Sequence, residues 1–346
     1  MTSLADVVEI VIGVDTHVGT HSAAIIHAGT GAVIDEITVS TTEEGYQELL
    51  DFTEPHPALR AWAIEGTGSH GAGLTRLLDD ELVIELDRPA RMKRRNGAKS
   101  DPLDAVRAGR EALSRTLNGT PRGNGDRQAL SVLLAARRSA VDAYTTAQRQ
   151  IHGLIIAAPT VLRDKLRGHN TAQMVTIAAG WRINTVWDTE TRTTATILKT
   201  LARRVRDLKA EAAVHEKAIK TIVNSWRPDV LDIHGVGPIV AAVVLCAWSH
   251  PGRIHSEAAF AMLAGAAPIP ATSGQVTTRY RLNRYGDRQL NRALHTVVLT
   301  RQRYDDQTKT YTERRTTEGK TPREIRRCLK RFIARQIFRQ LEHQHA

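Results

Sequence analysis

The stretch "VVEIVIGVD" (residues 7–15) is an almost uninterrupted run of apolar, mostly β-branched residues that ends in an aspartate. Such a short run is typical of a strand that is buried on both faces of a sheet. A second strand is expected over "SAAIIHA" (22–28) and a third over "AVIDEITV" (32–39), after the turn-forming "GTG". The sequence therefore predicts a three-stranded meander whose first strand ends at Asp15.

A fourth and a fifth strand continue this pattern. Thr41 and Glu44 predict a capping box for a helix that runs to about Phe52. "LRAWAIE" (59–65) is a further buried strand that ends in an acid, and "LVIELD" (82–87) is the fifth, with a helix between them. The resulting order, βββαβαβα, is that of a ribonuclease-H-like α/β layer, in which the first and fourth strands are central neighbours.

Two aspartates stand at the start of the next helix, in "GAKSDPLDAVRAGREAL" (97–113). In one interpretation, Asp101 is the N-cap, Pro102 is the first helical residue, and Asp104 is an acid that suits the positive helix end. In the other interpretation, the two carboxylates are half of a metal site. The two interpretations are compatible, because both carboxylates then project from the same first turn.

Four acids together favour the metal site. If the first and fourth strands are adjacent and parallel, their carboxyl ends bring Asp15 and Glu65 to one edge of the sheet, and the following helix adds Asp101 and Asp104. Carboxylate oxygens suit Mg²⁺, or alternatively Mn²⁺, which keep positions open for water and phosphate. Two such ions about 4 Å apart would stabilise both oxygens of a phosphodiester displacement. No other cofactor is expected.

The positive charge of the chain is concentrated in its last part. Residues 271–346 hold 18 Lys and Arg against 7 Asp and Glu, so their net charge of +11 equals that of all 346 residues. Such segregation indicates a module that faces a polyanion, although a generally basic, solvated surface is the simpler alternative. No stretch reaches membrane-spanning length, no signal peptide opens the sequence, and two cysteines form no disulfide framework, so a reducing cytoplasm is expected.

A helical middle part is expected after the α/β layer. "NGTPRGNGD" (118–126) has the composition of a linker, and residues 127–226 are largely helical by pattern. Within them, side chains recur at alternating steps of three and four, as in a coiled coil: Leu198, Leu201, Val205, Leu208, Ala212, His215, Ile219 and Ile222. This seam packs either against the chain's own bundle or against another subunit.

The C-terminal part is expected to be mainly helical and to contact nucleic acid. Gly235 and Gly237 predict a helix-hairpin-helix-like turn, which either presents backbone N–H groups to a phosphate or is a plain tight turn. The last helix, "TPREIRRCLKRFIARQIFRQL" (321–341), has one apolar side and arginines elsewhere, and tyrosines interleave the nearby cations. We therefore predict three domains: 1–117, 118–227 and 228–346.

Several segments resemble the motifs of a known family. "IGVDTH" (12–17), "AIEGTGSHG" (63–71) and "KSDPLDAVRAG" (99–109) look like the DEDD motifs of insertion-sequence transposases with a RuvC-like N-terminal domain, the IS-one-ten type. The Piv-like DNA invertases are close relatives of that family. "LAGAAPIPATSGQVTTRYRLNRYGDRQLNRAL" (263–294) resembles its second conserved domain. Together these segments and their order cover nearly the whole chain.

The resemblance implies a set of catalytic residues. Asp15, Glu65, Asp101 and Asp104 match the metal-binding acids of the family. Ser273 matches a serine that, in the family, attacks the DNA backbone and forms a covalent serine–phosphate link. By its own chemistry Ser273 is a weak nucleophile unless a metal or a base activates it, and "TSG" alone is an ordinary turn.

Three neighbouring residues stay outside this set. Thr272 is the nearest rival of the serine. Asp287 stands where the family often shows an uncharged polar residue, which concerns the contact of Gly286–Arg288 and not the assignment. His70, beside the second acid, would order a metal-bound water or, more simply, is a loop residue.

The resemblance also implies partners. Members of the family use a structured non-coding RNA that pairs with donor and target DNA, so that base pairing selects the sequence and the protein recognises shape and phosphates. Strand exchange joins two duplexes, so a homodimer or homotetramer that acts at the bacterial nucleoid is expected, without a membrane. The candidate nucleic-acid-binding residues are Lys93, Arg94, Arg95, Lys99, Gly235, Gly237, Arg279, Arg281, Arg284 and Arg288.

The sequence thus predicts a transposase that exchanges DNA strands. The alternatives are a Holliday-junction-type endonuclease or a site-specific DNA invertase with the same four acids, and a non-catalytic nucleic-acid-binding protein. Ser273→Ala separates the recombinase from the nuclease, because a nuclease attacks with activated water. Asp101→Asn separates both enzymes from a silent binding protein.

Overall fold

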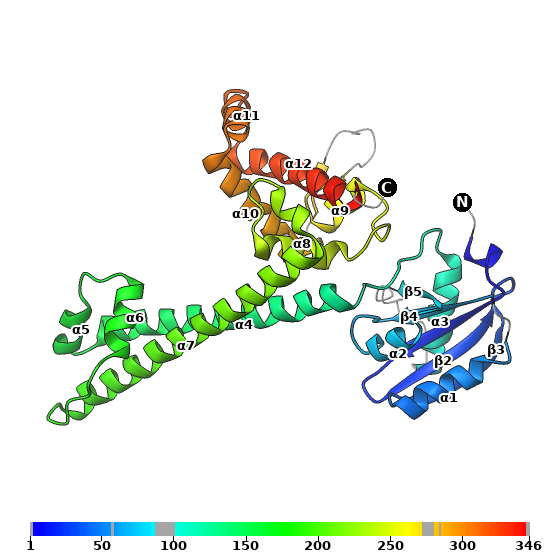
Figure 1. Ribbon diagram of the computed structural model, residues 1–346, viewed down its shortest axis with the longest axis horizontal. Coiled ribbons are helices and arrows are strands. Elements are labelled where there is room, and N and C mark those ends of the chain that lie inside the picture. Colours follow the sequence, from blue (N-terminus) through cyan, green and yellow to red (C-terminus); the bar gives the residue numbers. More distant parts are fainter. Residues whose placement is uncertain (1–2, 57–58, 87–100, 272–279, 284, 344–346) are drawn as a thin grey trace. The chain divides into compact units, whose positions relative to one another are not determined.

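The computed structural model describes residues 3–56, 59–86, 101–271, 280–283 and 285–343. The chain forms two compact units, Met1–Asn124 and Gly125–Ala346, each with its own apolar core (Figure 1). The domain boundaries at 117/118 and 227/228 remain predictions. Helix 125–157 and residues on both sides of position 227 contribute to one core in the second unit.

The first unit is built on a five-stranded sheet. Its strands are β1 (Ile10–Thr16), β2 (Thr20–His27), β3 (Val33–Ser40), β4 (Arg60–Glu65) and β5 (Leu82–Leu86), in the order β3-β2-β1-β4-β5. β1 runs antiparallel to β2 and parallel to β4, and β4 runs parallel to β5. The prediction that the first and fourth strands are central neighbours is therefore confirmed.

Helices pack on both faces of this sheet. A short 3₁₀ helix, η1 (Leu4–Asp6), precedes β1. α1 (Glu43–Thr53) and α2 (Ala72–Leu77) share one apolar cluster with Ile12, Val14 and Trp62. α3 (Asp101–Ser114) packs on the opposite face, with Val11, Ala61 and Ala63. Because strand residues alternate between the two faces, odd-numbered positions of β1 and β4 lie on the α3 side.

The cap of α1 differs from the prediction by one residue. Thr42, not Thr41, accepts a hydrogen bond from the backbone N–H of Gly45 at 3.2 Å. The Thr41 hydroxyl instead donates to the carbonyl of Val18 at 2.8 Å and so joins two loops. The described part of α3 starts at Asp101, and the residue before it, which bears on the predicted cap, lies outside the described residues.

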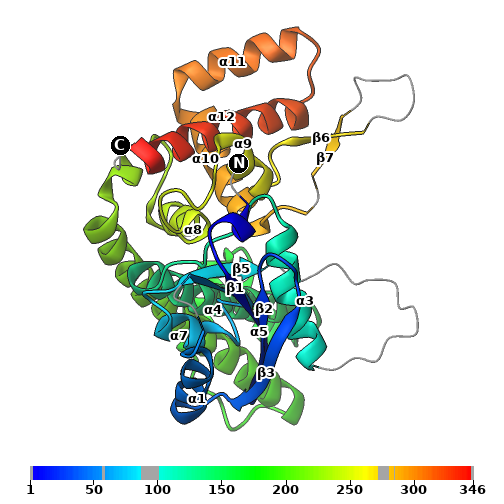
Figure 2. The ribbon, with the colours of Figure 1, turned by 90° about the vertical axis from the view of Figure 1, so that its right-hand side faces the viewer.

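The second unit is almost entirely helical. Its elements are α4 (Gly125–Ala157), α5 (Thr160–Leu166), α6 (Thr171–Ala179), α7 (Thr189–Trp226), η2 (Pro228–Asp232), α8 (Pro238–Trp248), α9 (Glu257–Leu263), β6 (Pro268–Pro270), β7 (Tyr280–Leu282), α10 (Arg288–Tyr304), α11 (Asp306–Thr317) and α12 (Pro322–His343). β6 and β7 pair as a two-stranded hairpin that extends from the helices of this unit (Figure 2). Within the described ranges, no helix is both long and apolar enough to cross a membrane.

The two long helices of this unit lie side by side and antiparallel (Figure 1). Leu130 of α4 shares a cluster with Val223 of α7, whereas Ile151 shares one with Leu198. The predicted seam therefore packs, over much of its length, against the chain's own bundle, and a coiled coil between subunits remains a prediction. The helix-hairpin-helix likeness is not confirmed, since only the five-residue 3₁₀ helix η2 precedes the turn.

Candidate active site

Asp15 and Glu65 lie at the same edge of the sheet. The parallel register of β1 and β4 pairs Val14 with Ile64, so the two acids follow at the next position of each strand. The Thr16 hydroxyl donates to the carbonyl of Glu65 at 2.8 Å and ties the two strand ends together. Both acids occupy positions of the α3 side, because Gly13 and Ala63 precede them by two residues.

The direction of α3 brings its first turn toward this edge. Ala105 packs near Ala24, whereas Ala112 shares a cluster with Leu4 and Val8 at the opposite end of β1. The helix therefore runs antiparallel to β1, and its N-terminal turn, which contains Asp101 and Asp104, lies toward the ends of β1 and β4. The side chain of Asp101 is not among the described ones.

The close approach of α3 to β1 depends on glycine. A Cβ atom on Gly13 would stand 2.1 Å from the carbonyl oxygen of Ala105 and 2.5 Å from the backbone nitrogen of Gly109. Real Cβ atoms do not approach backbone atoms so closely, so a side chain at this position would push the helix outward. The sequence signals for this contact are "IGVD" and "RAG".

The acids have polar partners in this conformation. Asp15 is buried, and its Oδ2 lies 3.2 Å from Nε2 of His17. Asp104 accepts a hydrogen bond from Nη1 of Arg107 at 2.6 Å. His21, next to β1 on β2, stacks on Tyr46 with ring centroids 5.7 Å apart. Burial lowers the pKa of His21, which favours its neutral form.

His17 and His21 were missed by sequence reasoning, which considered only His70. The charges of His17, Asp15 and His70 all act on His21, and of these imidazoles His17 contacts the Asp15 carboxylate. The segment "DTHVGTH" contains the available signal, namely two histidines that follow the acid of a buried strand within six residues.

A divalent metal ion fits the chemistry of these donors. Carboxylate oxygens at the ends of β1 and β4 are hard ligands of the kind that Mg²⁺ and Mn²⁺ prefer. Among the described side chains, no three from His, Cys, Asp and Glu stand close enough together to hold an ion. The predicted ligand set includes Asp101, whose side chain lies outside that description.

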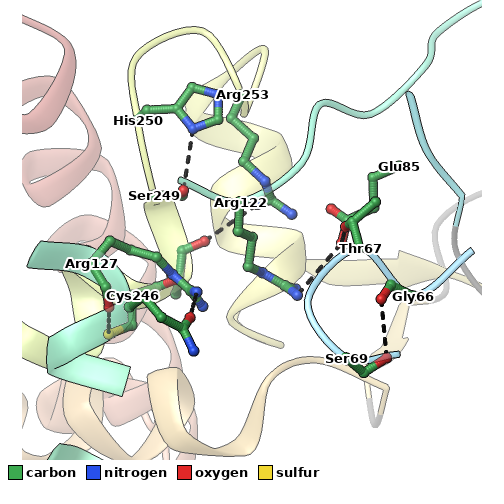
Figure 3. Close-up of polar contacts among 12 residues, drawn as sticks. Gly66, Thr67, Ser69, Glu85, Arg122, Arg127, Cys246, Ser249, His250 and Arg253 are labelled. Atoms are coloured by element: carbon green, nitrogen blue, oxygen red, sulfur yellow. Dashed lines mark hydrogen bonds and ion pairs between the residues drawn. The ribbon is translucent and has the colours of Figure 1, made fainter. Parts of the chain in front are cut away.

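The loop after Glu65 is fixed by a second acid, Glu85, which the sequence analysis did not single out (Figure 3). The Thr67 hydroxyl donates to Oε1 of Glu85 at 3.0 Å, and Nη1 of Arg122 lies 3.7 Å from the same oxygen. Within the loop, Ser69 donates to the carbonyl of Gly66, which has a φ of +72°. Glu85 thus holds the loop that follows the second metal-ligand candidate.

Many of the predicted nucleic-acid ligands lie outside the described residues. These are Lys93, Arg94, Arg95, Lys99, Arg279 and Arg284, together with the candidate nucleophile Ser273. Arg281 and Arg288 are described and exposed. Gly235 adopts a φ of +83° in the turn before α8, and the carbonyl of His234 in that turn accepts a hydrogen bond from Nε of Arg301 at 2.8 Å.

The sheet order and the acids at its edge define the class: a mixed α/β protein compatible with a ribonuclease-H-like DEDD domain. A family model for DEDD transposases, described as "Transposase", matches residues 12–157, and a second, described as "Transposase IS116/IS110/IS902 family", matches residues 229–313. The chain belongs to this family of insertion-sequence transposases. The DEDD domain implies a divalent metal cofactor.

A curated relative supports this assignment over part of the chain. An "Insertion element IS900 uncharacterized 42 kDa protein" of Mycobacterium paratuberculosis is 32% identical over 129 residues, which are 36% of this chain. The chain covers about a third (32%) of the length of that relative. What this chain does, and with which partners, is therefore argued below from its own residues.

Proposed function

We propose that this transposase cleaves and exchanges the DNA strands of an insertion element in a metal-dependent reaction. The observation that carries the proposal is the position of Asp15 and Glu65 at the ends of adjacent parallel strands, on the face covered by α3. The first turn of α3 adds Asp101 and Asp104 from the same edge. Four carboxylates in this arrangement suit phosphodiester chemistry better than a structural role.

The four acids would hold Mg²⁺ or Mn²⁺ at this edge. A bound ion supplies positive charge to the attacking and leaving oxygens of a phosphodiester displacement. Within the chain, the Thr16 hydroxyl and the Gly13 contact position the strand ends and α3, and His17 holds the Asp15 carboxylate. The Glu85 contacts keep the loop after Glu65 in place.

The proposed nucleophile is Ser273. Its Oγ attacks a backbone phosphorus, one P–O ester bond breaks, and the leaving oxygen gains the proton that the serine hydroxyl loses, so that a serine–phosphate ester forms. A free hydroxyl end of the other strand then attacks this ester, which restores the serine hydroxyl and joins the exchanged strands. Both steps conserve the number of ester bonds.

The proposed partners are donor and target DNA and a structured guide RNA. The C-terminal segment supports a polyanionic partner, because it holds the net positive charge of the chain. Exchange between two duplexes requires more than one active site, so we propose a homodimer or homotetramer. In this proposal the reaction takes place in the bacterial cytoplasm, at the nucleoid.

Substitution of single acids tests the metal-dependent reaction. We expect Asp15→Asn to reduce cleavage of end-labelled element DNA at least about 100-fold, since even residues that only support a ligand cost 10–100-fold. Asp80→Asn, an exposed acid at the end of the α2 region, is the matched control. Equal cleavage by the two variants on a denaturing gel would contradict the proposal.

Ser273→Ala separates this reaction from that of a structure-specific nuclease. A serine recombinase loses strand exchange and the covalent protein–DNA adduct, which migrates as a shifted band on a denaturing protein gel. A nuclease that uses activated water keeps its cleavage activity. Retained cleavage in Ser273→Ala would therefore replace the recombinase proposal by the nuclease alternative.

A further inference from the structure

The second unit contains an open pocket of about 520 Å³ beside the β6–β7 hairpin. It lies where the turn before α10 meets α9 and α12. None of its eight lining residues carries a carboxylate, and four are basic. The lining residues are Gly265, Asn283, Gly286, Arg288, Asn291, Arg292, His295 and Lys330.

The wall of this pocket is rigidly built. Three successive carbonyls at the end of α9 accept hydrogen bonds from the facing turn: Met262 from Nδ2 of Asn283 at 2.9 Å, Leu263 from the backbone of Asp287 at 2.6 Å, and Ala264 from Nδ2 of Asn291 at 2.7 Å. Gly265 and Gly286 pack backbone to backbone, since a Cβ on Gly286 would stand 2.3 Å from the nitrogen of Gly265. The turn is therefore preorganised.

Lys330 is a cation fixed in this wall. Its Nζ lies 2.7 Å from Oδ1 of Asn291, whose own amide is already held by α9. Burial and then the charge of Arg327 lower the pKa of Lys330, so both effects disfavour its charged form. A phosphate in the pocket would offset them, because an anion stabilises the ammonium.

His295 also lines the pocket and carries a buried polar atom. Its Nδ1 is buried and has no hydrogen-bond partner in the described part of the chain. Burial, followed by the charges of Lys330 and Arg326, lowers the pKa of His295. A neutral His295 leaves Arg288, Arg292 and Lys330 as the cations of the pocket wall.

Exposed aromatic rings flank this pocket. Tyr285 is 94% exposed and stands between the lining residues Asn283 and Gly286 in the chain, and Tyr280 of β7 is 63% exposed. The backbone N–H of Tyr285 donates to Oδ1 of Asn283 at 2.9 Å, so the backbone that carries this ring is tied to a lining residue of the pocket. Exposed rings beside a cationic groove are typical of sites that stack unpaired bases.

We propose that this pocket binds one backbone phosphate of an unpaired nucleic-acid strand and that a neighbouring base of that strand stacks on Tyr285. Lys330 and Arg292 contact the phosphate from α12 and α10. The site rests on the proposed function only in that strand exchange supplies unpaired strands. Its lining residues belong to the second unit, whereas the four acids belong to the first.

Charge-removing variants test the phosphate contact. Lys330→Gln keeps a donor for Asn291 and removes the charge, and Arg323→Gln removes an equal charge from an exposed position on the same helix. We expect Lys330→Gln and Arg292→Gln to weaken binding of a labelled eight-nucleotide single strand about tenfold at constant salt, because each removes a charge-assisted hydrogen bond. Arg323→Gln should change binding less than twofold.

An equal effect of all three variants would show a diffuse charge effect and overturn the proposal. Thermal melting of each variant verifies that the second unit is folded. The assay is run with single-stranded DNA, single-stranded RNA and duplex DNA of the same length. The two single strands identify the source of the phosphate, whereas preferential loss on the duplex would overturn the unpaired-strand assignment.

Tyr285 variants test the stacking contact. Tyr285→Phe retains a ring and should bind single strands as tightly as the parent. Tyr285→Leu should weaken the binding of single strands about tenfold and leave the binding of duplex DNA unchanged. Equal binding by both variants would overturn the assignment of Tyr285. Cleavage by Asp15→Asn reports on the proposed function independently, so a failure of the pocket variants leaves that proposal intact, and the reverse also holds.

Discussion

Gly13 of β1 and Gly109 of α3 lie against each other, and this contact holds the acid-bearing turn of α3 over the sheet. A Cβ on Gly13 would meet two backbone atoms within 2.5 Å, whereas a Cβ on Gly109 would meet, at 2.5 Å, the terminal methyl of Ile26, which can move aside. A side chain at Gly13 is therefore expected to destabilise the fold more than a side chain at Gly109.

We expect Gly13→Ala to destabilise the first unit by about 1–3 kcal/mol through overpacking, and Gly109→Ala to cost less. Gly19→Ala is the control, because a Cβ there meets nothing within 4 Å. Urea unfolding of the full chain, combined with amide exchange in peptides of β1 and α3, measures the order of effects. An effect of Gly13→Ala no larger than that of Gly19→Ala would contradict the packing argument.

A buried ion pair supports the second unit. Nε and Nη2 of Arg227 donate to the two carboxylate oxygens of Asp229 at 2.7 and 2.8 Å, and the same guanidinium binds the carbonyls of Gln340 and Leu341 at the end of α12. Both side chains are buried. Breaking one side of such a pair leaves an uncompensated charge, so Asp229→Asn should lower the free energy of unfolding by about 3 kcal/mol.

The same pair predicts a pH dependence. The hydrogen bonds of Arg227 lower the pKa of Asp229 below its usual 3.8, against the effect of burial. Its contribution to stability is therefore complete above pH 3.8 and is lost as the pH falls through the lower, folded-state value. Acid unfolding should begin at a higher pH in Asp229→Asn than in the parent. Asp306→Asn, in an exposed ion pair with Lys309, should behave like the parent.

The sequence predicted the sheet because its strands have strong signals. The apolar runs before Asp15 and Glu65 and the glycine-rich turns between elements are local features, and the placement of β1 beside β4 follows from the order of elements. The acids of the candidate site were found for the same reason, since each ends a strand or begins a helix. The cap of α1 lies one residue after the predicted one, because adjacent polar residues compete for the N-cap.

Contacts between distant segments could not be predicted in this way. Nothing local to Glu85 shows that it accepts a hydrogen bond from Thr67, and nothing near Lys330 shows that Asn291 holds it. Such contacts arise only when packing brings together side chains far apart in the sequence. The segment before Gly235 forms a 3₁₀ helix with the sequence PDVLD, and five residues with two acids and a proline are too few to separate an α-helix from a 3₁₀ helix by their pattern.

Removal of divalent metal should abolish strand cleavage while DNA binding persists. The acids of the first unit would hold the ion, whereas the basic residues of the second unit would bind the phosphates, so the two properties are expected to separate. Cleavage assays with EDTA, followed by addition of Mg²⁺ or Mn²⁺, measure the first property, and gel shifts at constant ionic strength measure the second. Full cleavage activity in EDTA would exclude the metal site.

The loop after Glu65 gives a prediction about how the second acid is positioned. Thr67→Val keeps the shape of the side chain but removes the hydrogen bond to Glu85, so we expect a loss of stability of about 1 kcal/mol and a severalfold decrease of the cleavage rate. Ser69→Ala removes an exposed hydroxyl bond within the same loop and should change both much less. Amide exchange of residues 66–71 and single-turnover cleavage compare the two variants. Faster exchange in Thr67→Val with unchanged cleavage would show that the loop is held by Glu85 but does not position Glu65.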